Sequence, residues 1–210
     1  MIRIAVDKAQ KEGKHDQKHE WMISHGCELE FLPLPVGDYV LIGEEMAETI
    51  RRRGKKLKKM DLLGDISLSV DTKASVSEIY QNLVGPQHAR FRDECILAQK
   101  NHIKLIVLIE SGPEVLTYTD LERWHDVKRE MIFRASVRKK YNLIGTTAAE
   151  LDAAIADLNT HGAGIRPPVS GGHLAKAMRT MEQKYGVEFR FCCKEETGLI
   201  ILQLLTEKSL

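Results

Sequence analysis

The sequence predicts an α/β domain, and two observations support that prediction. Short apolar, strand-like runs alternate along the chain with longer segments of helical character, which is the pattern of a sheet covered by helices. The run at 104–110 (Lys-Leu-Ile-Val-Leu-Ile-Glu) is apolar throughout its middle, as expected of a strand buried on both faces. A chain of 210 residues is long enough for one good core, so we expect a single domain over residues 1–210.

Turn and cap residues divide the N-terminal half into short elements. Gly26 follows a helical segment at the position where glycine commonly ends a helix. Ser77 is a suitable N-cap because its hydroxyl can accept a bond from an unpaired backbone N–H, and Gly85-Pro86 interrupts the helix that it starts. In chain order we expect strand 2–7, helix 14–25, strands 27–34, 39–42 and 66–71, a helix from Ser77, and helix 87–101.

The C-terminal half continues the alternation after the strand at 104–110. Leu174, Ala177, Met178 and Met181 form one apolar stripe of a helix. Glu195 lies where the N-terminus of a helix favours negative charge. The expected elements are a helix starting near Thr119, an Ala-rich helix at 146–159, helix 172–185, strand 187–193 and helix 195–206.

Composition is that of an ordinary globular protein and argues against a membrane protein. No apolar run is long enough to span a bilayer, and the N-terminus has the pattern of a strand rather than of a signal peptide. The cysteines show neither a C-x-x-C pair nor the spacing of a disulfide framework, so we expect them to be reduced and mostly packed, in a cytoplasmic protein. They are Cys27, Cys95, Cys192 and Cys193.

Two short motifs carry the chemistry. Gly37-Asp38-Tyr39 and Val70-Asp71-Thr72-Lys73 each place a carboxylate at the end of an apolar run. Two carboxylates can hold a hard divalent cation such as Mg²⁺ or Mn²⁺, and Lys73 can orient or activate a water or stabilise a charged transition state. This is the PD-(D/E)XK arrangement of metal-assisted phosphodiester hydrolysis, although an Asp-x-Lys triplet by itself recurs by chance in many chains.

The order of the motifs resembles the nuclease domain of the XPF family of structure-specific DNA endonucleases, which includes the archaeal protein Hef. The match runs nearly from end to end, and no single motif in it is decisive. The segments that carry it are Val6-Asp7, Gly37-Asp38-Tyr39-Val40, Val70-Asp71-Thr72-Lys73, Ser77-Glu78-Ile79, Arg90 to Cys95, Leu105 to Glu110, Phe189 to Cys192, and Glu196-Thr197.

This resemblance implies a restriction-endonuclease-like fold, with a mixed central sheet flanked by helices, and a metal-dependent endonuclease that cuts branched or flapped DNA. It implies that Asp38, Asp71 and the Thr72 carbonyl hold Mg²⁺ or Mn²⁺, that Asp7 assists, and that Lys73 orients or activates the attacking water. Arg90 would contact a phosphate, for which a guanidinium fork is well suited. A homodimer or a partner subunit is left open.

The chain also departs from the family pattern. Asp71 replaces a glutamate, Thr72 an arginine and Glu94 a glutamine, and the 210 residues contain no segment like the tandem helix-hairpin-helix repeats that relatives commonly carry. This weakens the inference about branched DNA. One alternative is a catalytically inactive DNA-binding or scaffold module that supports a partner nuclease. Another is a resolvase or restriction-type nuclease of a phage or mobile element.

Two segments are extra to the family pattern. Residues of about 44–64 are polar, basic and bounded by Gly43 and Gly64, so we expect a hairpin tip or a mobile insertion there, and about 111–168 is expected to be a helical insertion. The first segment joins the two strands with the candidate carboxylates, so we interpret its basic residues as contacts to DNA near the cut, with a solvated loop as the alternative. They are Arg51, Arg52, Arg53, Lys55, Lys56, Lys58 and Lys59. A looser basic stretch covers 128–140.

Other polar residues have simpler interpretations. His15 and His19 have the spacing of zinc ligands on a helix, but the sequence offers no third ligand. Glu78 and Glu94 are expected to be solvated or ion-paired helix residues, with a role in the site as the alternative.

Overall fold

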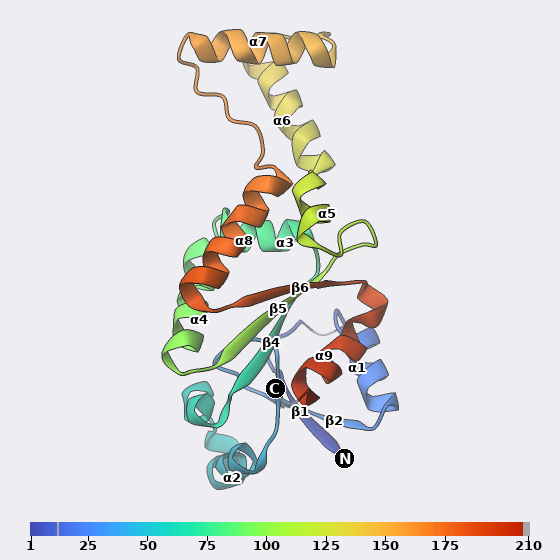
Figure 1. The fold of residues 1–210 in the computed structure, drawn as a ribbon, viewed down its shortest axis with the longest axis vertical. Coiled ribbons are helices and arrows are strands. Elements are labelled where there is room, and N and C mark those ends of the chain that lie inside the picture. Colours follow the sequence, from blue (N-terminus) through green and yellow to red (C-terminus); the bar gives the residue numbers. More distant parts are fainter. Residues whose placement is uncertain (12, 208–210) are drawn as a thin grey trace.

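A six-stranded mixed sheet organises the protein (Figure 1), whose computed structural model describes residues 1–11 and 13–207. Its strand order is β2-β1-β3-β4-β5-β6. β1 is parallel to β2 and antiparallel to β3, β3 is antiparallel to β4, and β4, β5 and β6 are mutually parallel. The strands are β1 (Ile2–Asp7), β2 (Cys27–Leu32), β3 (Tyr39–Leu41), β4 (Leu68–Lys73), β5 (Lys104–Glu110) and β6 (Glu188–Cys192).

Helices cover both faces of the sheet, and each face has its own apolar core. On one face α1 (Asp16–Ser24) and α9 (Thr197–Thr206) pack on Ile4, Val70 and Leu108. The other face buries Ala5, Val107 and further side chains of alternate positions. It is covered by α2 (Glu44–Arg53), α3 (Val76–Leu83), α4 (His88–Lys100), α5 (Tyr118–Arg123) and α8 (Gly171–Tyr185). This architecture confirms the predicted fold class and is consistent with a restriction-endonuclease-like fold.

Within the described residues, no helix is long and apolar enough to cross a membrane. Cys27, Cys95 and Cys192 are buried thiols, as the sequence predicted.

The segment at 44–64 is not the hairpin tip or mobile insertion that its composition predicted. It forms α2 and two 3₁₀ turns, η1 (Gly54–Lys56) and η2 (Lys59–Asp65). Met46 and Leu62 are fully buried in the core, and Leu57 packs against it. These three apolar residues therefore anchor the segment to the core, although most of its residues are polar and suggested a loop.

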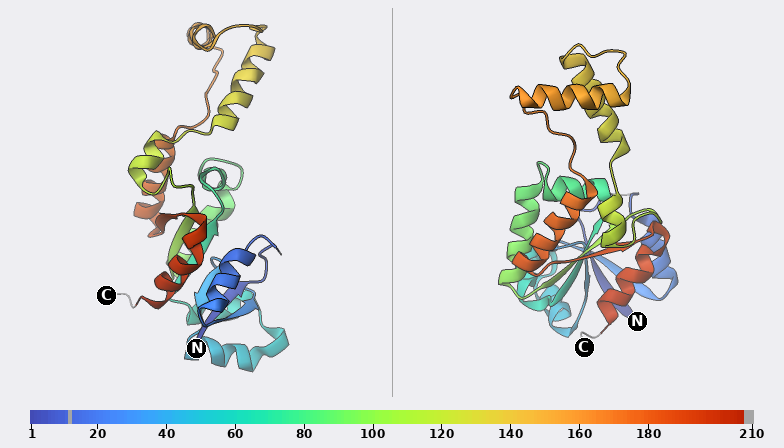
Figure 2. Two further views of the ribbon diagram at one scale, coloured as in Figure 1. Left: turned by 90° about the vertical axis from the view of Figure 1, so that its right-hand side faces the viewer. Right: turned by 45° about the horizontal axis from the view of Figure 1, so that its top comes forward.

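Residues 111–168 contain three helices, and most of this segment stands away from the body (Figure 2). After α5 the chain forms α6 (Val127–Lys140) and α7 (Ala148–Thr160) and returns to α8 through an extended stretch. In two views α6 and α7 project as an arm beyond the sheet and its covering helices (Figure 2). A short 3₁₀ turn, η3 (Lys194–Glu196), precedes α9.

Gly37 is required where the chain turns into β3. Its φ is +67°, a backbone conformation that residues with a side chain rarely adopt. A Cβ added there would lie 2.2 Å from Ser69 Oγ and 3.2 Å from the Val70 carbonyl oxygen. Ser69 Oγ cannot retreat easily, because it donates a 2.8 Å hydrogen bond to the Val36 carbonyl. Only glycine lets this turn lie against β4.

We therefore predict that Gly37→Ala lowers the free energy of unfolding by about 2–4 kcal/mol, the sum of a backbone penalty and an overpacking penalty. Gly26→Ala is the matched control, because Gly26 also has a positive φ (+85°) but a Cβ added there would meet no atom within 4 Å. Urea unfolding of both variants measures the difference. An equal loss of unfolding free energy in the two variants would mean that the contact with Ser69 does not contribute to the destabilisation.

Candidate functional site

Three aspartates predicted from the sequence meet at one end of the sheet. Asp7 ends β1, Asp38 immediately precedes β3, and Asp71 lies in the C-terminal half of β4. The Asp7 N–H donates to the Asp38 carbonyl at 2.8 Å, and the Asp38 N–H donates to the Val70 carbonyl at 2.9 Å. These backbone bonds join the Gly37-Asp38 turn to both neighbouring strands, so the three carboxylates are held at one edge.

Asp71 and Lys73 form a buried ion pair. Lys73 Nζ lies 2.5 Å from Asp71 Oδ2, and the two side chains are only 7% and 6% exposed. Phe91 of α4 lies beneath the pair, with its ring centroid 5.7 Å from Lys73 Nζ. Neither charge has direct access to bulk water, so each depends on its neighbours for stabilisation.

Burial and charge shift both pKa values. Burial raises the pKa of the Asp71 carboxyl above its ordinary value; the adjacent Lys73 opposes this, while Asp38 and Glu94 add to it. Burial alone would lower the pKa of Lys73, but the Asp71 carboxylate outweighs it and the pKa of Lys73 is raised. At Asp7 burial also raises the pKa, against hydrogen bonds from the N–H groups of Ala9 and Leu34. This end of the sheet therefore holds a cluster of carboxylates around Lys73.

Thr72 has a role that the sequence did not reveal. Asp38 Oδ2 accepts hydrogen bonds from both the Thr72 N–H at 2.9 Å and Thr72 Oγ1 at 2.6 Å. The Thr72 hydroxyl therefore orients the Asp38 carboxylate. This bond fixes one oxygen of Asp38 against β4.

The structure shows that Glu94 and Glu78, for which the sequence supported the same interpretation, have different contacts. Glu94 Oε1 accepts a 2.9 Å hydrogen bond from the Gly37 N–H, which brings α4 against the turn that carries Asp38. Arg90 lies one helical turn earlier on α4, exposed and on the same side of the helix as Glu94. Glu78 instead stays at the start of α3, where its carboxylate accepts from the Ala74 N–H at 2.9 Å. The side-chain cap of α3 is Ser75 and not Ser77 as predicted.

The donor set suits a hard divalent cation. Among the described residues no three His, Cys, Asp or Glu side chains gather in an arrangement that would itself hold a metal ion. Mg²⁺, however, is commonly bound by one or two carboxylates and keeps several waters. Asp71 Oδ2 is buried and, apart from its ion pair with Lys73, has no well-aligned hydrogen-bond partner among the described residues. The oxygens of Asp38 and Asp71 therefore fit the predicted cation.

A second buried ion pair was missed by sequence reasoning. Lys18 of α1 bonds Glu110 at the end of β5, and the two side chains are 6% and 4% exposed. The signal was a glutamate that ends a strand buried on both faces, since such a charge needs a partner. His19, on the same helix as Lys18, makes a 3.0 Å hydrogen bond with the Tyr39 hydroxyl.

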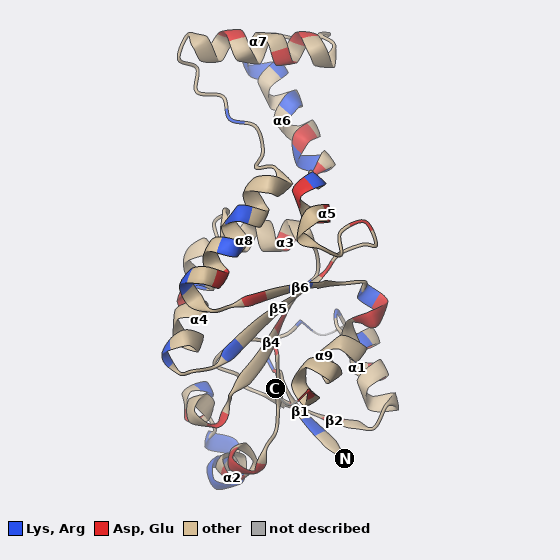
Figure 3. Cartoon of the chain, in the orientation of Figure 1, with Lys and Arg blue, Asp and Glu red and all other residues tan. Residues whose placement is uncertain are grey.

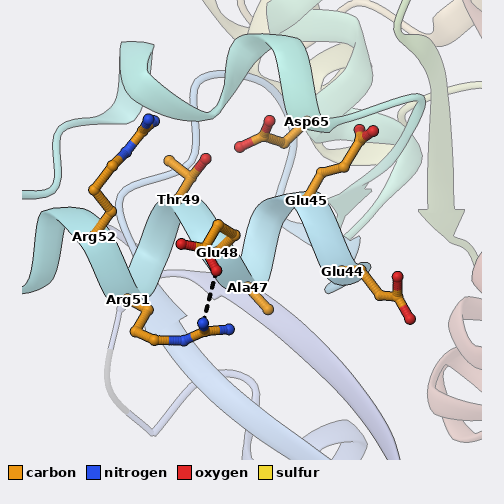
Figure 4. Close-up of a pocket in the computed structure, with 8 residues that line it drawn as sticks. All are labelled: Glu44, Glu45, Ala47, Glu48, Thr49, Arg51, Arg52 and Asp65. Atoms are coloured by element: carbon orange, nitrogen blue, oxygen red, sulfur yellow. Dashed lines mark hydrogen bonds and ion pairs between the residues drawn. The ribbon is translucent and has the colours of Figure 1, made fainter.

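The basic block is not a loop at the cut site. The chain leaves β3 at Leu41, the end opposite Asp38, so the inference that this connection joins the two carboxylate ends was wrong. Lys59 nevertheless comes close enough to Asp7 to oppose, in small part, the rise in the pKa of its carboxyl that burial causes. Figure 4 shows that Arg51 and Arg52 share a surface pocket with four carboxylates, and Arg51 bonds Glu48 at 2.7 Å. Arg53 pairs with Asp61 at 2.9 Å.

No protein-family model and no curated protein matches the chain. Among solved structures, the chain is similar to XPF from Aeropyrum pernix at 16% sequence identity and a TM-score of 0.46. The likeness covers 99% of this chain and 62% of that protein, so the chain spans less than two thirds of its length. At this level of similarity, function has to be argued from the chain's own residues.

His19 gives the fold a predictable dependence on pH. The pKa of His19 is lowered from 6.5 to about 4, mainly by burial and in smaller part by the positive charges of His15 and Lys18. Between these values the unfolded chain binds a proton that the folded chain does not. The stabilisation is therefore complete above pH 6.5 and is lost as the pH falls toward 4.

We predict that the free energy of unfolding of the wild type falls between pH 7 and pH 5, and that His19→Gln reduces this fall. Urea unfolding at both pH values measures it, and His161→Gln at an exposed position is the control. A fall of the same size in all three proteins would contradict the assignment to His19.

Proposed function

We propose that the protein is a metal-dependent nuclease that hydrolyses phosphodiester bonds in DNA. The observation that carries this proposal is the buried Asp71–Lys73 ion pair, held beside Asp38 at one edge of the sheet. Replacing a buried ion pair by apolar side chains is often neutral or stabilising. A pair of this kind next to two further carboxylates is therefore better explained by chemistry than by stability.

The residues have distinct roles in this proposal. The carboxylates of Asp38 and Asp71 and the Thr72 carbonyl would hold Mg²⁺ or Mn²⁺, with Asp7 assisting. When bound, such a cation lowers the pKa of a coordinated water and neutralises charge on the phosphate. The Thr72 N–H and hydroxyl keep the Asp38 carboxylate in place.

Lys73 acts as a cation. Its ion pair with Asp71 keeps the ammonium protonated, and a protonated lysine donates hydrogen bonds but accepts no proton. Lys73 would therefore orient the attacking water and stabilise the charge that develops on the phosphate. Of the two roles that the sequence left open, orientation and charge stabilisation fit this arrangement better than deprotonation.

DNA would reach the edge from the side of Arg90, which lies on α4 one turn from Glu94. In the basic block Arg52, Lys55, Lys56, Lys58 and Lys59 are exposed and make no ion pair among the described residues, so we propose them as phosphate contacts. The slope of log K against log[salt] tests this, because each lost duplex contact should flatten it by about 0.9. The preference for branched or flapped DNA comes from the sequence resemblance.

The inactive scaffold remains the contrasting function. It predicts DNA binding without cleavage, and it assigns no role to Lys73. The intact set of Asp38, Asp71 and Lys73 favours the enzyme.

We predict that Asp38→Asn and Asp71→Asn each abolish cleavage while the fold and most DNA binding persist, because each removes charge that a divalent cation requires. Labelled flap, fork, nicked and linear DNAs are incubated with Mn²⁺ or with EDTA, and circular dichroism monitors the fold. Asp93→Asn, at an exposed position of α4, is the control. Cleavage by both variants at the wild-type rate would exclude this site.

We predict that Lys73→Met slows the chemical step by roughly 10²–10⁴-fold, the scale of a positioned charge-stabilising group. Methionine retains the length of the buried side chain, so the packing on Phe91 is disturbed less than by alanine. Single-turnover rates at saturating enzyme measure the effect, with Lys100→Met on the surface of α4 as control. If affinity falls and the rate does not, Lys73 is a phosphate anchor instead.

A further inference from the structure

The arm formed by α6 and α7 buries very little of itself. Each of the two helices contributes one buried residue, Val137 on α6 and Leu151 on α7. Helices of this length are marginally stable in water unless one face packs against something. With so little of its surface buried, the arm has the character of an element that is stabilised by packing against a partner.

The base of the arm is fixed to the body near the candidate site. Ser77 Oγ of α3 donates a 2.8 Å hydrogen bond to Asp126, the N-cap of α6. The guanidinium of Arg129 lies 3.8 Å from the centroid of the Tyr80 ring. These contacts set the direction in which the arm leaves the body, so its outer surfaces are presented in a defined orientation.

α6 exposes one continuous side whose centre is apolar. Positions 127, 128, 131, 132, 135, 136, 139 and 140 are all exposed, and their spacing places them along one side of the helix. Met131 and Ile132 at its centre are 67% and 60% exposed. Lysines lie at both ends of this side, at Lys128 and at Lys139 and Lys140. Large apolar side chains in the middle of an exposed helix face mark a docking surface.

α7 exposes a surface of the opposite kind. Ala149, Ala153 and Ala156 are exposed small residues that allow another helix to approach closely. The charged residues of α7 are all acidic, Glu150, Asp152 and Asp157, whereas six of the seven charged residues of α6 are basic. Figure 3 shows this contrast, with blue dominating α6 and red appearing on α7.

We propose that the arm is a dimerisation element, in which α6 of one copy of this chain docks on α7 of a second copy. The large apolar residues of α6 would pack on the alanines of α7. The exposed lysines of α6 would meet Glu150 and Asp157, since Asp152 already pairs with Arg134 of its own chain at 2.9 Å. The same chain carries both surfaces, so a twofold axis satisfies both contacts at once. Like-charged pairings of α6 with α6 or of α7 with α7 are disfavoured.

Nucleic acid is a poorer occupant of this surface. The centre of the exposed side of α6 is apolar, and the acidic residues of α7 would repel phosphates. The proposal depends on neither the metal site nor the cleavage of DNA.

The first test is the mass of the protein in solution without DNA or metal, measured by light scattering across about 1–100 μM, a range set by mass action. The wild type is expected at twice the chain mass of 23.8 kDa. The double variant Met131→Ser with Ile132→Ser should weaken the dimer by about 100-fold, the scale of central interface residues. Ile23→Ser, at an exposed apolar position of α1, is the matched control.

The second test identifies which helices meet. Chains carrying Met131→Cys are mixed with chains carrying Ala153→Cys and treated with a short bismaleimide. A crosslinked dimer in the mixture, and little in either variant alone or in the wild type, is the expected result. A monomeric wild type, an unaltered dimer in the double serine variant, or efficient crosslinking of Met131→Cys alone would each overturn the proposal.

Discussion

The turn at Gly37 and Asp38 holds the candidate site together. Its backbone bonds Asp7 on one side and Val70 on the other, and the positive φ of Gly37 allows it to lie against β4. The side chain of Asp38 then bonds Thr72, and the Gly37 N–H bonds Glu94 on α4. Strands that run in opposite directions, and a helix from one face, therefore meet at the same few atoms. The positions of the carboxylates follow from this junction.

Two buried ion pairs lie near this end of the sheet, Asp71–Lys73 on the face of α4 and Lys18–Glu110 on the face of α1. Burying charges is costly, and a pair repays that cost only with good geometry and further hydrogen bonds. The Lys18–Glu110 pair connects α1 to the end of β5. The Asp71–Lys73 pair has further carboxylates nearby instead of further donors, which suits it to a cation that is not part of the chain.

Local patterns predicted most elements and the positions of Asp38 and Asp71, because strand ends and apolar runs can be recognised over a few residues. The segment at 44–64 was misjudged because Met46 and Leu62 are spaced widely among charged residues, and their burial depends on distant strands. Glu78 and Glu94 could not be distinguished, since both lie on helices and only packing decides which helix faces Gly37. The partner of Glu110 lies 92 residues away, beyond any local pattern.

The central claim is that Asp38 and Asp71 form a site for a hard divalent cation, and direct binding tests it without reference to catalysis. Electron paramagnetic resonance measures the depletion of unbound Mn²⁺ by the wild type and by folded Asp71→Asn protein. The account predicts saturable binding to the wild type that Mg²⁺ competes away, and strongly weakened binding to Asp71→Asn. Equal binding to the two proteins, or none to the wild type, would contradict it.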